Sequence, residues 1–215
     1  MKGDKLQIFD WFYSGSDSPA FGDEPTRELL EHVRATRSTG RVLDLGCGDA
    51  RNSLFLAAAG YDVTGIDSSE AGVNKLMRMA RERMLGDRIT GVVADARDWI
   101  FKPMRFDLLV AVTLLDHLPG EDIDRVLNQM TASLRPAGTA LVQVHTVDDP
   151  GCRKIAPHDT SEMAAAVRYY FDRNELRERL SGRLRVMHYE ERLEYDTHHG
   201  PPHHHGLAVA LGVKD

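Results

Sequence analysis

From residue 41 onward, short apolar runs alternate with longer amphipathic segments, and this pattern restricts the fold more than any other feature of the sequence. Such alternation is typical of a parallel sheet whose strands are joined by crossover helices. The apolar runs predict strands at 41–45, 62–66, 89–93, 106–112 and 139–145, and two longer ones at 184–195 and 206–213. Helical spacing of apolar residues covers 53–59, 69–84, 123–134 and, more weakly, 97–100.

The last two predicted strands are separated by a segment that is too short for a crossover helix. Such a connection makes an antiparallel hairpin. A crossover through 161–181 would lead into it. We therefore predict an α/β fold, with a Rossmann-like, seven-stranded, mostly parallel sheet, a C-terminal antiparallel hairpin and helices on both faces.

Composition excludes several classes of protein. The net charge is −6 without an extended basic run, which disfavours a nucleic-acid partner. Two cysteines cannot form a disulfide framework, and no apolar run approaches the roughly 18 residues of a membrane helix. The N-terminal residues lack the basic and apolar regions of a signal peptide, so we expect a cytoplasmic protein with no membrane partner. We expect a monomer or a homodimer.

Two glycines turn the chain after the first predicted strand, in the loop Asp44-Leu-Gly-Cys-Gly. Glycine permits a tight turn and a close approach of the backbone to a ligand. Asp67 ends the second predicted strand, where an acidic side chain can accept hydrogen bonds from ribose hydroxyls. Asp95 ends the third strand and can reach an exocyclic amine, while the backbone of Ala96 meets the ring. Together these residues predict a nucleoside site.

A dinucleotide fingerprint would continue to a third glycine, but Arg51 stands at that position. The acidic Asp44 would repel a pyrophosphate, whereas it can pair with the amino group of a zwitterionic amino acid. A cationic sulfonium also suits an acidic pocket better than a phosphate does.

At these residues the sequence resembles class I S-adenosylmethionine-dependent methyltransferases over nearly its full length. The resemblance rests on the glycine loop and on 65–67 (Gly-Ile-Asp), 94–96 (Ala-Asp-Ala), 106–110 (Phe-Asp-Leu-Leu-Val) and 134–138 (Leu-Arg-Pro-Ala-Gly). It implies that Asp44 lies near the methionine part of S-adenosyl-L-methionine, Asp67 on the ribose and Asp95 on the adenine. A narrower resemblance, over 48–57 and 60–63, is to the tellurite-resistance and thiopurine-type methyltransferases. Asp49-Ala50 departs from that branch, which more often has another small or amide residue there.

The predicted cofactor site comprises the loop residues and those that follow strands two, three and four. Its members are Asp44, Gly46, Cys47, Gly48, Arg51, Asn52, Asp67, Ser68, Asp95, Ala96, Ala111, Val112 and His117.

In the single domain that we predict over 1–215, residues 1–40 form an N-terminal helical lid with helices near 8–13 and 26–36. The cofactor-binding core is 41–146, and 147–215 is the substrate-side crossover with the terminal hairpin. The aromatic residues of the first helix, Tyr13 among them, have an alternative interpretation as packing on the core.

Methyl transfer is an in-line displacement, so the protein mainly positions the reactants and excludes water. His117 follows strand four and His145 ends strand five, and both are candidate catalytic residues. Asp116, Asp148 and Asp149 could hold a divalent metal, but we expect solvated turn residues and no metal.

A histidine-rich segment at 198–205 precedes the last strand. Because the sixth strand should run parallel to the first five, its turn lies on the cofactor side of the sheet. Clustered imidazoles there could bind an anion, line the substrate pocket or ligate a metal, or form a polar hairpin tip. The predicted substrate residues are Tyr13, His145, Arg168, His203, His204 and His205.

The sequence therefore predicts a methyltransferase for a small-molecule acceptor. Candidate acceptors are soft or anionic nucleophiles such as a thiol, a thiopurine or a tellurite-like or selenite-like anion. The alternative is a catalytically silent cofactor-binding protein with a regulatory or interaction role.

Overall fold

A computed structural model describes residues 3–15, 17, 19–48, 50–153, 166–198 and 200–215. Within these residues, seven strands form one sheet in the order β3-β2-β1-β4-β5-β7-β6. The strands are β1 (Arg41–Leu45), β2 (Asp62–Asp67), β3 (Ile89–Val93), β4 (Phe106–Val112), β5 (Leu134–His145), β6 (Arg185–Asp196) and β7 (His203–Val213). The first five are parallel to one another, and β7 is antiparallel to both β5 and β6. The predicted fold class is confirmed.

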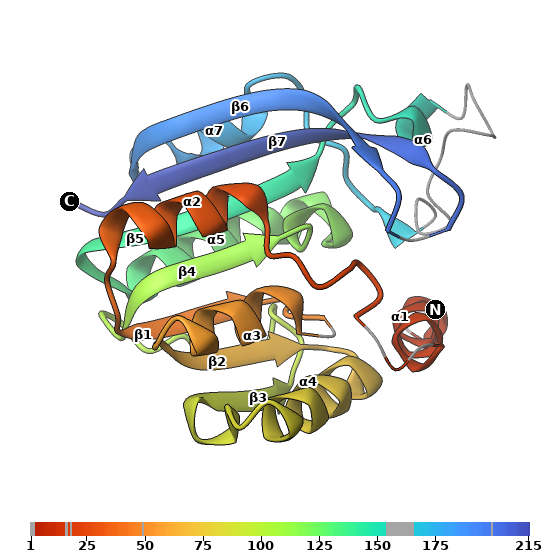
Figure 1. The fold of residues 1–215 in the computed structure, drawn as a ribbon. Coiled ribbons are helices and arrows are strands. Elements are labelled where there is room, and N and C mark those ends of the chain that lie inside the picture. The colour runs from red at the N-terminus through yellow and green to blue at the C-terminus, as the bar shows by residue number, and fades with distance from the viewer. Residues whose placement is uncertain (1–2, 16, 18, 49, 154–165, 199) are drawn as a thin grey trace.

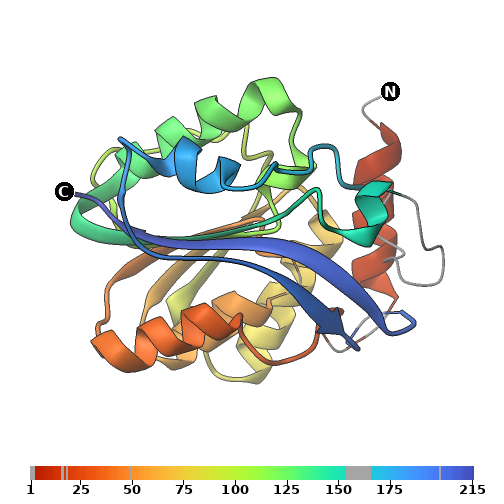
Figure 2. The same ribbon diagram turned by 90° about the horizontal axis from the view of Figure 1, so that it is seen from above.

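Helices cover both faces of the sheet, which gives three layers (Figures 1 and 2). One face carries α2 (Arg27–Thr36), α3 (Arg51–Ala58) and α4 (Glu70–Glu82), and the other carries α5 (Gly120–Ser133) and α7 (Glu175–Leu180). The helices α1 (Gly3–Ser14) and α6 (Pro150–Arg153) lie beyond the carboxyl ends of the parallel strands. Two short 3-10 helices are η1 (Gly86–Arg88) and η2 (Leu115–His117).

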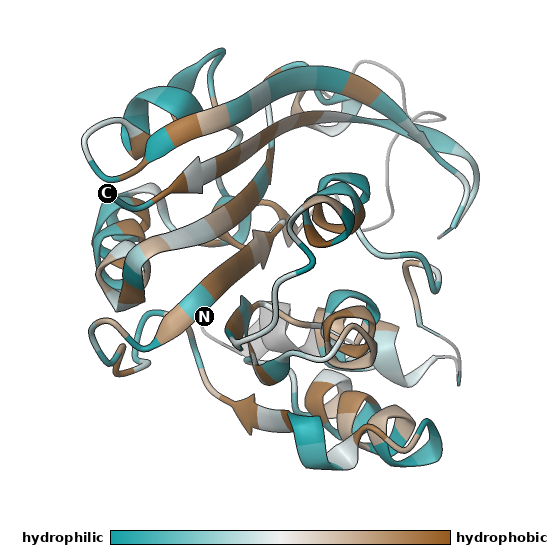
Figure 3. Ribbon diagram, turned by 60° about the vertical axis from the view of Figure 1, so that its left-hand side comes forward, coloured by the Kyte–Doolittle hydropathy of each residue, from teal (hydrophilic) through white to brown (hydrophobic). Residues whose placement is uncertain are grey.

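The core has two halves, one on each side of the sheet. Side chains of β4 alternate between them, with Leu109 on the face of α5 and Leu108 on the other. The central strands are coloured mainly as hydrophobic, whereas the helices carry both hydrophilic and hydrophobic residues (Figure 3). Within the described residues, no helix is both long and apolar enough to cross a membrane.

Three sequence predictions differ from the structure. The predicted helix at 97–100 is a turn, because the Asp95 carboxylate accepts a hydrogen bond from the backbone N–H of Arg97 at 2.9 Å, and such a contact competes with helix formation. Strand β5 begins at Leu134, which pairs with Phe106 before a register shift. Strand β7 begins at His203, before the predicted start at residue 206, because His203 pairs with Asp196 of β6. Part of the predicted crossover at 161–181 lies outside the described residues.

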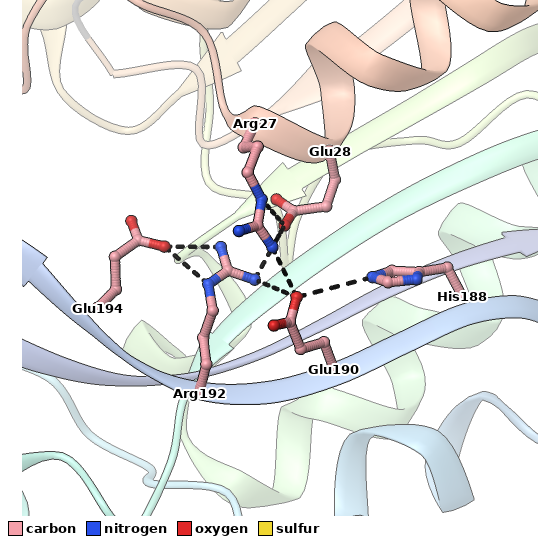
Figure 4. A network of polar contacts seen from close by, with 6 residues as sticks. All are labelled: Arg27, Glu28, His188, Glu190, Arg192 and Glu194. Carbon is pink, nitrogen blue, oxygen red and sulfur yellow. Dashed lines mark hydrogen bonds and ion pairs between the residues drawn. The ribbon is translucent and has the colours of Figure 1, made fainter.

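A network of charged side chains joins α2 to β6 (Figure 4). The buried Glu28 contacts the guanidinium groups of Arg27 and Arg192, each at 2.9 Å. Arg192 also contacts Glu190 and Glu194 on its own strand. This network fixes the N-terminal segment against the terminal hairpin, on the face opposite α5 and α7.

Candidate functional site

A cavity of about 520 Å³ lies at the carboxyl ends of the parallel strands. It is lined by the loops after β1 to β5, by aromatic residues of the N-terminal segment and by part of the terminal hairpin. Strand order reverses between β1 and β4, and ligands of open α/β sheets bind at such a switch point.

The glycine loop and Asp67 form one end of the cavity. Gly46 and Gly48 have φ angles of +70° and +52°, which favour glycine. One Asp67 oxygen accepts the backbone N–H of Gly48 and the other that of Ser69, both at 2.8 Å. A carboxylate has about four lone-pair positions, so Asp67 keeps acceptor capacity for a ligand's hydroxyl groups.

Asp44 lies behind this loop and does not line the cavity. Its carboxylate accepts a hydrogen bond from Ser53 Oγ at 2.6 Å and is almost fully buried. Burial raises the pKa of Asp44 to about 6, with the Ser53 hydrogen bond acting against burial and the charge of Asp67 adding to it. Asp44 does not line the cavity. Its predicted contact with the methionine part of the cofactor therefore stays a prediction.

Asp95 lines the cavity but already has a charged partner. Arg97 Nε lies 2.9 and 3.0 Å from the two carboxylate oxygens of Asp95. Arg97 lines the cavity as well. It is not among the predicted site residues, because residues 97–100 were interpreted as a helix.

The first helix closes the cavity beside the glycine loop. Phe9 and Tyr13 line the cavity, and their rings stack at 6.0 Å. A Cβ atom on Gly48 would lie 2.8 Å from the Tyr13 hydroxyl oxygen. The fit between loop and helix therefore depends on glycine at this position.

At the opposite end of the cavity, Asp116 and His145 form a buried pair. Oδ2 of Asp116 bonds Nδ1 of His145, and the side chains are 0% and 12% exposed. Burial would raise the pKa of Asp116, but the nearby imidazoles of His117 and His145 keep it below its usual value. Burial would lower the pKa of His145, but the Asp116 carboxylate raises it. The expectation that Asp116 is a solvated turn residue is wrong, because η2 turns its side chain inward.

His117 lines the same region and packs edge-on against Phe9, with ring centroids 5.1 Å apart. Its Nδ1 lies 3.1 Å from the backbone carbonyl oxygen of Ala166. A carbonyl only accepts, so Nδ1 carries the proton and a neutral His117 has its lone pair on Nε2.

The histidines of β7 separate according to the alternation of a strand. His203 and His205 lie on one side, with their Nε2 atoms 2.9 Å apart. Nδ1 of His205 lies 3.3 Å from Oδ2 of Asp149. His204 lies on the other side, where its ring packs against Tyr195 at 4.9 Å.

Asp149 is buried, contrary to the expected solvated turn. Its Oδ1 accepts the Gly151 N–H at 2.7 Å and its Oδ2 accepts the Gly206 N–H at 3.1 Å. These bonds attach the chain after β5 to strand β7. The hydrogen bonds need Gly206, since an added Cβ atom there would lie 2.3 Å from the Asp149 nitrogen.

Most of the predicted site residues line this one cavity. They are Tyr13, Gly46, Cys47, Gly48, Arg51, Asn52, Asp67, Ser68, Asp95, Ala96, Val112, His117, His145, Arg168 and His205. Four predicted residues do not line it: Asp44, Ala111, His203 and His204. Ala111 is fully buried within β4, so its side chain points into the core.

Phe9 and Tyr170 also line the cavity, although neither is among the predicted site residues. Tyr170 follows Arg168 in the predicted crossover, where side chains could supply charge and stacking to a substrate. The Tyr170 hydroxyl is buried and has no hydrogen-bond partner among the described residues. Burial raises the pKa of Tyr170 well above its usual value.

The order of the strands and the cavity at the switch point of the sheet define a Rossmann-like α/β domain. The family described as "Methyltransferase domain" matches residues 42–138. Over this segment the chain is similar to methyltransferases of the S-adenosylmethionine-dependent kind.

Two curated proteins are 32% identical to the chain over part of its length. One is Hemagglutinin 1 of Eikenella corrodens, over 133 residues that make up 60% of this chain and 43% of that protein. The other is 27-O-demethylrifamycin SV methyltransferase of Amycolatopsis mediterranei, over 126 residues that make up 57% of this chain and 46% of that protein. The chain thus spans about half the length of these relatives.

Among solved structures, TehB from Haemophilus influenzae has the same fold. It superposes with a TM-score of 0.74 at 23% identity, over 96% of this chain and 66% of that one. At this identity the likeness shows the fold alone.

Proposed function

We propose that this protein transfers the methyl group of S-adenosylmethionine to a small-molecule acceptor. The observation that carries the proposal is the continuity of the cavity, which joins Asp67 and the glycine loop at one end to His117, His145 and His205 at the other. The match of residues 42–138 to the methyltransferase domain supports the donor half of this proposal.

The residues present fit the methyl donor. Asp67 retains acceptor capacity for ribose hydroxyls, and Gly48 allows the backbone to approach a ligand closely because it has no side chain. The cavity volume falls within the roughly 300–1,000 Å³ of sites for small molecules and cofactors. When bound, the donor supplies an electrophilic methyl group on a cationic sulfur.

The acceptor that best suits the far end of the cavity has an ionisable hydroxyl or thiol group. A bound donor would supply its methyl carbon to a lone pair of the acceptor and would leave as S-adenosylhomocysteine. The acceptor's proton passes to Nε2 of His117, since the Nδ1 proton of that ring is held by Ala166. Soft anions such as thiolates, thiopurines or tellurite-like and selenite-like ions need no such base and stay within the proposal.

The rifamycin relative is named for a substrate that lacks an O-methyl group, which favours including hydroxyl acceptors. Of the predicted lid at 1–40, α2 packs on a face of the sheet, and we propose that α1 covers the donor. Support comes from Phe9 and Tyr13, which line the cavity from α1.

A second candidate is a cofactor-binding protein with an interaction role. The relative named as a hemagglutinin favours it, because that name describes adhesion and not transfer.

An acceptor screen with labelled methyl donor tests the proposal. We expect label in at least one phenol, thiol, thiopurine, selenite or tellurite, and at least tenfold less with His117→Ala for acceptors that must lose a proton (about 1.4 kcal/mol). Tight binding of S-adenosylhomocysteine without transfer to any acceptor would favour the second candidate instead.

A further inference from the structure

We propose that His145, Asp149 and His205 form a binding site for a divalent transition-metal cation at the acceptor end of the cavity. One potential ligand atom from each side chain lies within 4.8 Å of the other two. All three residues line the cavity, yet their side chains are only 5–12% exposed. The role suggested below for the metal rests on the proposed function, whereas the site itself does not.

The hydrogen bond to Asp116 fixes the tautomer of His145. A carboxylate only accepts, so Nδ1 of His145 carries the proton and Nε2 has the lone pair. No hydrogen bond to this Nε2 is present within the described part of the chain. A carboxylate behind an imidazole is the usual arrangement for a metal-binding histidine, because it orients the ring and raises its basicity.

A second chain of hydrogen bonds fixes the tautomer of His205. Nδ1 of His203 lies 2.7 Å from the Pro201 carbonyl oxygen, to which it must donate. The lone pair of a neutral His203 is then on Nε2, so His205 donates to it from its own Nε2 at 2.9 Å. The lone pair of His205 is therefore on Nδ1.

That lone pair faces a second acceptor. Nδ1 of His205 is 3.3 Å from Oδ2 of Asp149, and Asp149 is held in place by the N–H groups of Gly151 and Gly206. Two acceptor atoms at this separation repel each other unless a proton or a metal ion lies between them. A shared metal relieves the repulsion and also uses the free Nε2 of His145.

Two imidazole nitrogens and one carboxylate oxygen are a ligand set for Zn²⁺ and neighbouring first-row cations. Metal–ligand bonds of about 2.0–2.2 Å at tetrahedral angles place ligand atoms roughly 3.4 Å apart, close to the 3.3 Å between His205 and Asp149. Three protein ligands leave one position open. On the proposed function, that position receives the anionic oxygen or sulfur of the acceptor.

A second group of possible ligands, formed by Glu28, His188 and Glu190, does not suit a metal. Its carboxylates already contact the guanidinium groups of Arg27 and Arg192 (Figure 4). A divalent cation there would meet two fixed positive charges.

The test is a Zn²⁺ titration of the full, untagged chain in competition with a chromophoric chelator, and a parallel titration with Co²⁺ read by visible absorption. We expect one equivalent of either metal. His145→Gln, Asp149→Asn and His205→Gln should each weaken binding by at least about tenfold. His204→Gln is the matched control and should bind like the parent protein, because its ring lies on the other side of β7.

Each variant is first checked for native circular dichroism and for its affinity toward S-adenosylhomocysteine, which binds at the opposite end of the cavity. Folded variants that bind metal like the parent would overturn the proposal. A parent protein that binds no metal would also overturn it. So would a nitrogen-15 NMR measurement that finds both ring nitrogens of His205 protonated in the parent protein. The metal titration uses neither donor nor acceptor, so a negative result overturns the metal site and leaves the proposed function standing. A lack of S-adenosylhomocysteine binding would overturn the proposed function.

Discussion

Asp116 and His145 meet at the carboxyl ends of the neighbouring strands β4 and β5, with the carboxylate bonded to Nδ1 of the ring. The backbone carbonyl of Asp116 also accepts the N–H groups of Arg168 and Tyr169, at 2.8 and 3.0 Å. The carbonyl of His145 accepts the N–H of Phe171 at 3.0 Å. This pair therefore holds residues 168–171 beside the cavity and fixes the orientation of one imidazole in it.

Replacing Asp116 by Asn should separate positioning from cofactor binding. The amide has nearly the same shape but no charge, and it can present an N–H to His145 and reverse the ring's tautomer. We expect the turnover number to fall about 10–100-fold, with an unchanged dissociation constant for S-adenosylhomocysteine. Steady-state kinetics and calorimetry provide the two numbers, and a change in the dissociation constant alone would contradict this role.

The two adjacent histidines of β7 should behave differently. His205 lines the cavity, whereas His204 packs against Tyr195 outside it. His205→Ala should raise the acceptor KM at least about fivefold, roughly 1 kcal/mol, and leave the donor KM within twofold. If His204→Ala raised the acceptor KM as much, the assignment of faces would be wrong.

Asp44→Asn should stabilise the fold at neutral pH. The folded pKa of Asp44, about 6, lies above its usual 3.8, so its favourable contribution is full below pH 4 and is lost as pH rises through 6. Asn keeps the acceptor for Ser53 without titrating. The difference in free energy of unfolding between variant and parent should therefore grow by up to about 3 kcal/mol between pH 4 and pH 7.

Urea denaturation at several pH values measures this difference. A constant difference across the range would mean that Asp44 keeps an ordinary pKa in the fold. The same variant should bind the donor more weakly, because it removes the negative charge behind the glycine loop.

Glu28→Gln should destabilise the contact between α2 and β6. Burial opposes the charge of Glu28, but hydrogen bonding and the guanidinium groups of Arg192 and Arg27 keep its pKa below the usual value. We expect the free energy of unfolding to be about 1–2 kcal/mol lower than that of the parent at pH 7. This difference should disappear as the pH falls through the pKa of Glu28 in the folded protein. Glu194→Gln is the control, since that half-exposed side chain should contribute less than about 0.5 kcal/mol.

The sequence predicts the parallel core well because its strands are buried on both faces. β1, β3 and β4 have the predicted bounds, since apolar runs such as 106–112 end at polar or glycine residues. The ends of some helices and strands were harder to predict. The turn at 97–100 depends on the side chain of Asp95, and β7 begins early because Asp196 pairs with His203 across the hairpin.

That Asp67, Asp95 and the glycines line one cavity was predictable, because each lies at the end of a strand whose position is fixed by the sheet. The acceptor end was not. Whether His203, His204 or His205 faces the cavity depends on the register between β6 and β7, and a shift of one residue would exchange the faces. The burial of Asp149 depends on its approach to Gly206, which is 57 residues away along the chain.

The most direct test of the account is the binding of S-adenosylhomocysteine to the parent protein and to Asp67→Ala and Asp67→Asn, measured by calorimetry. We predict one site per chain, with binding weakened about 10–100-fold in both variants, because hydrogen bonds from the ribose hydroxyls to a charged acceptor contribute roughly 1.5–3 kcal/mol. Asn keeps one acceptor oxygen, which can serve the backbone N–H of Gly48 or that of Ser69 but not both, so it disturbs the loop less than Ala does. No binding by the parent protein, or equal affinity in all three, would contradict the account.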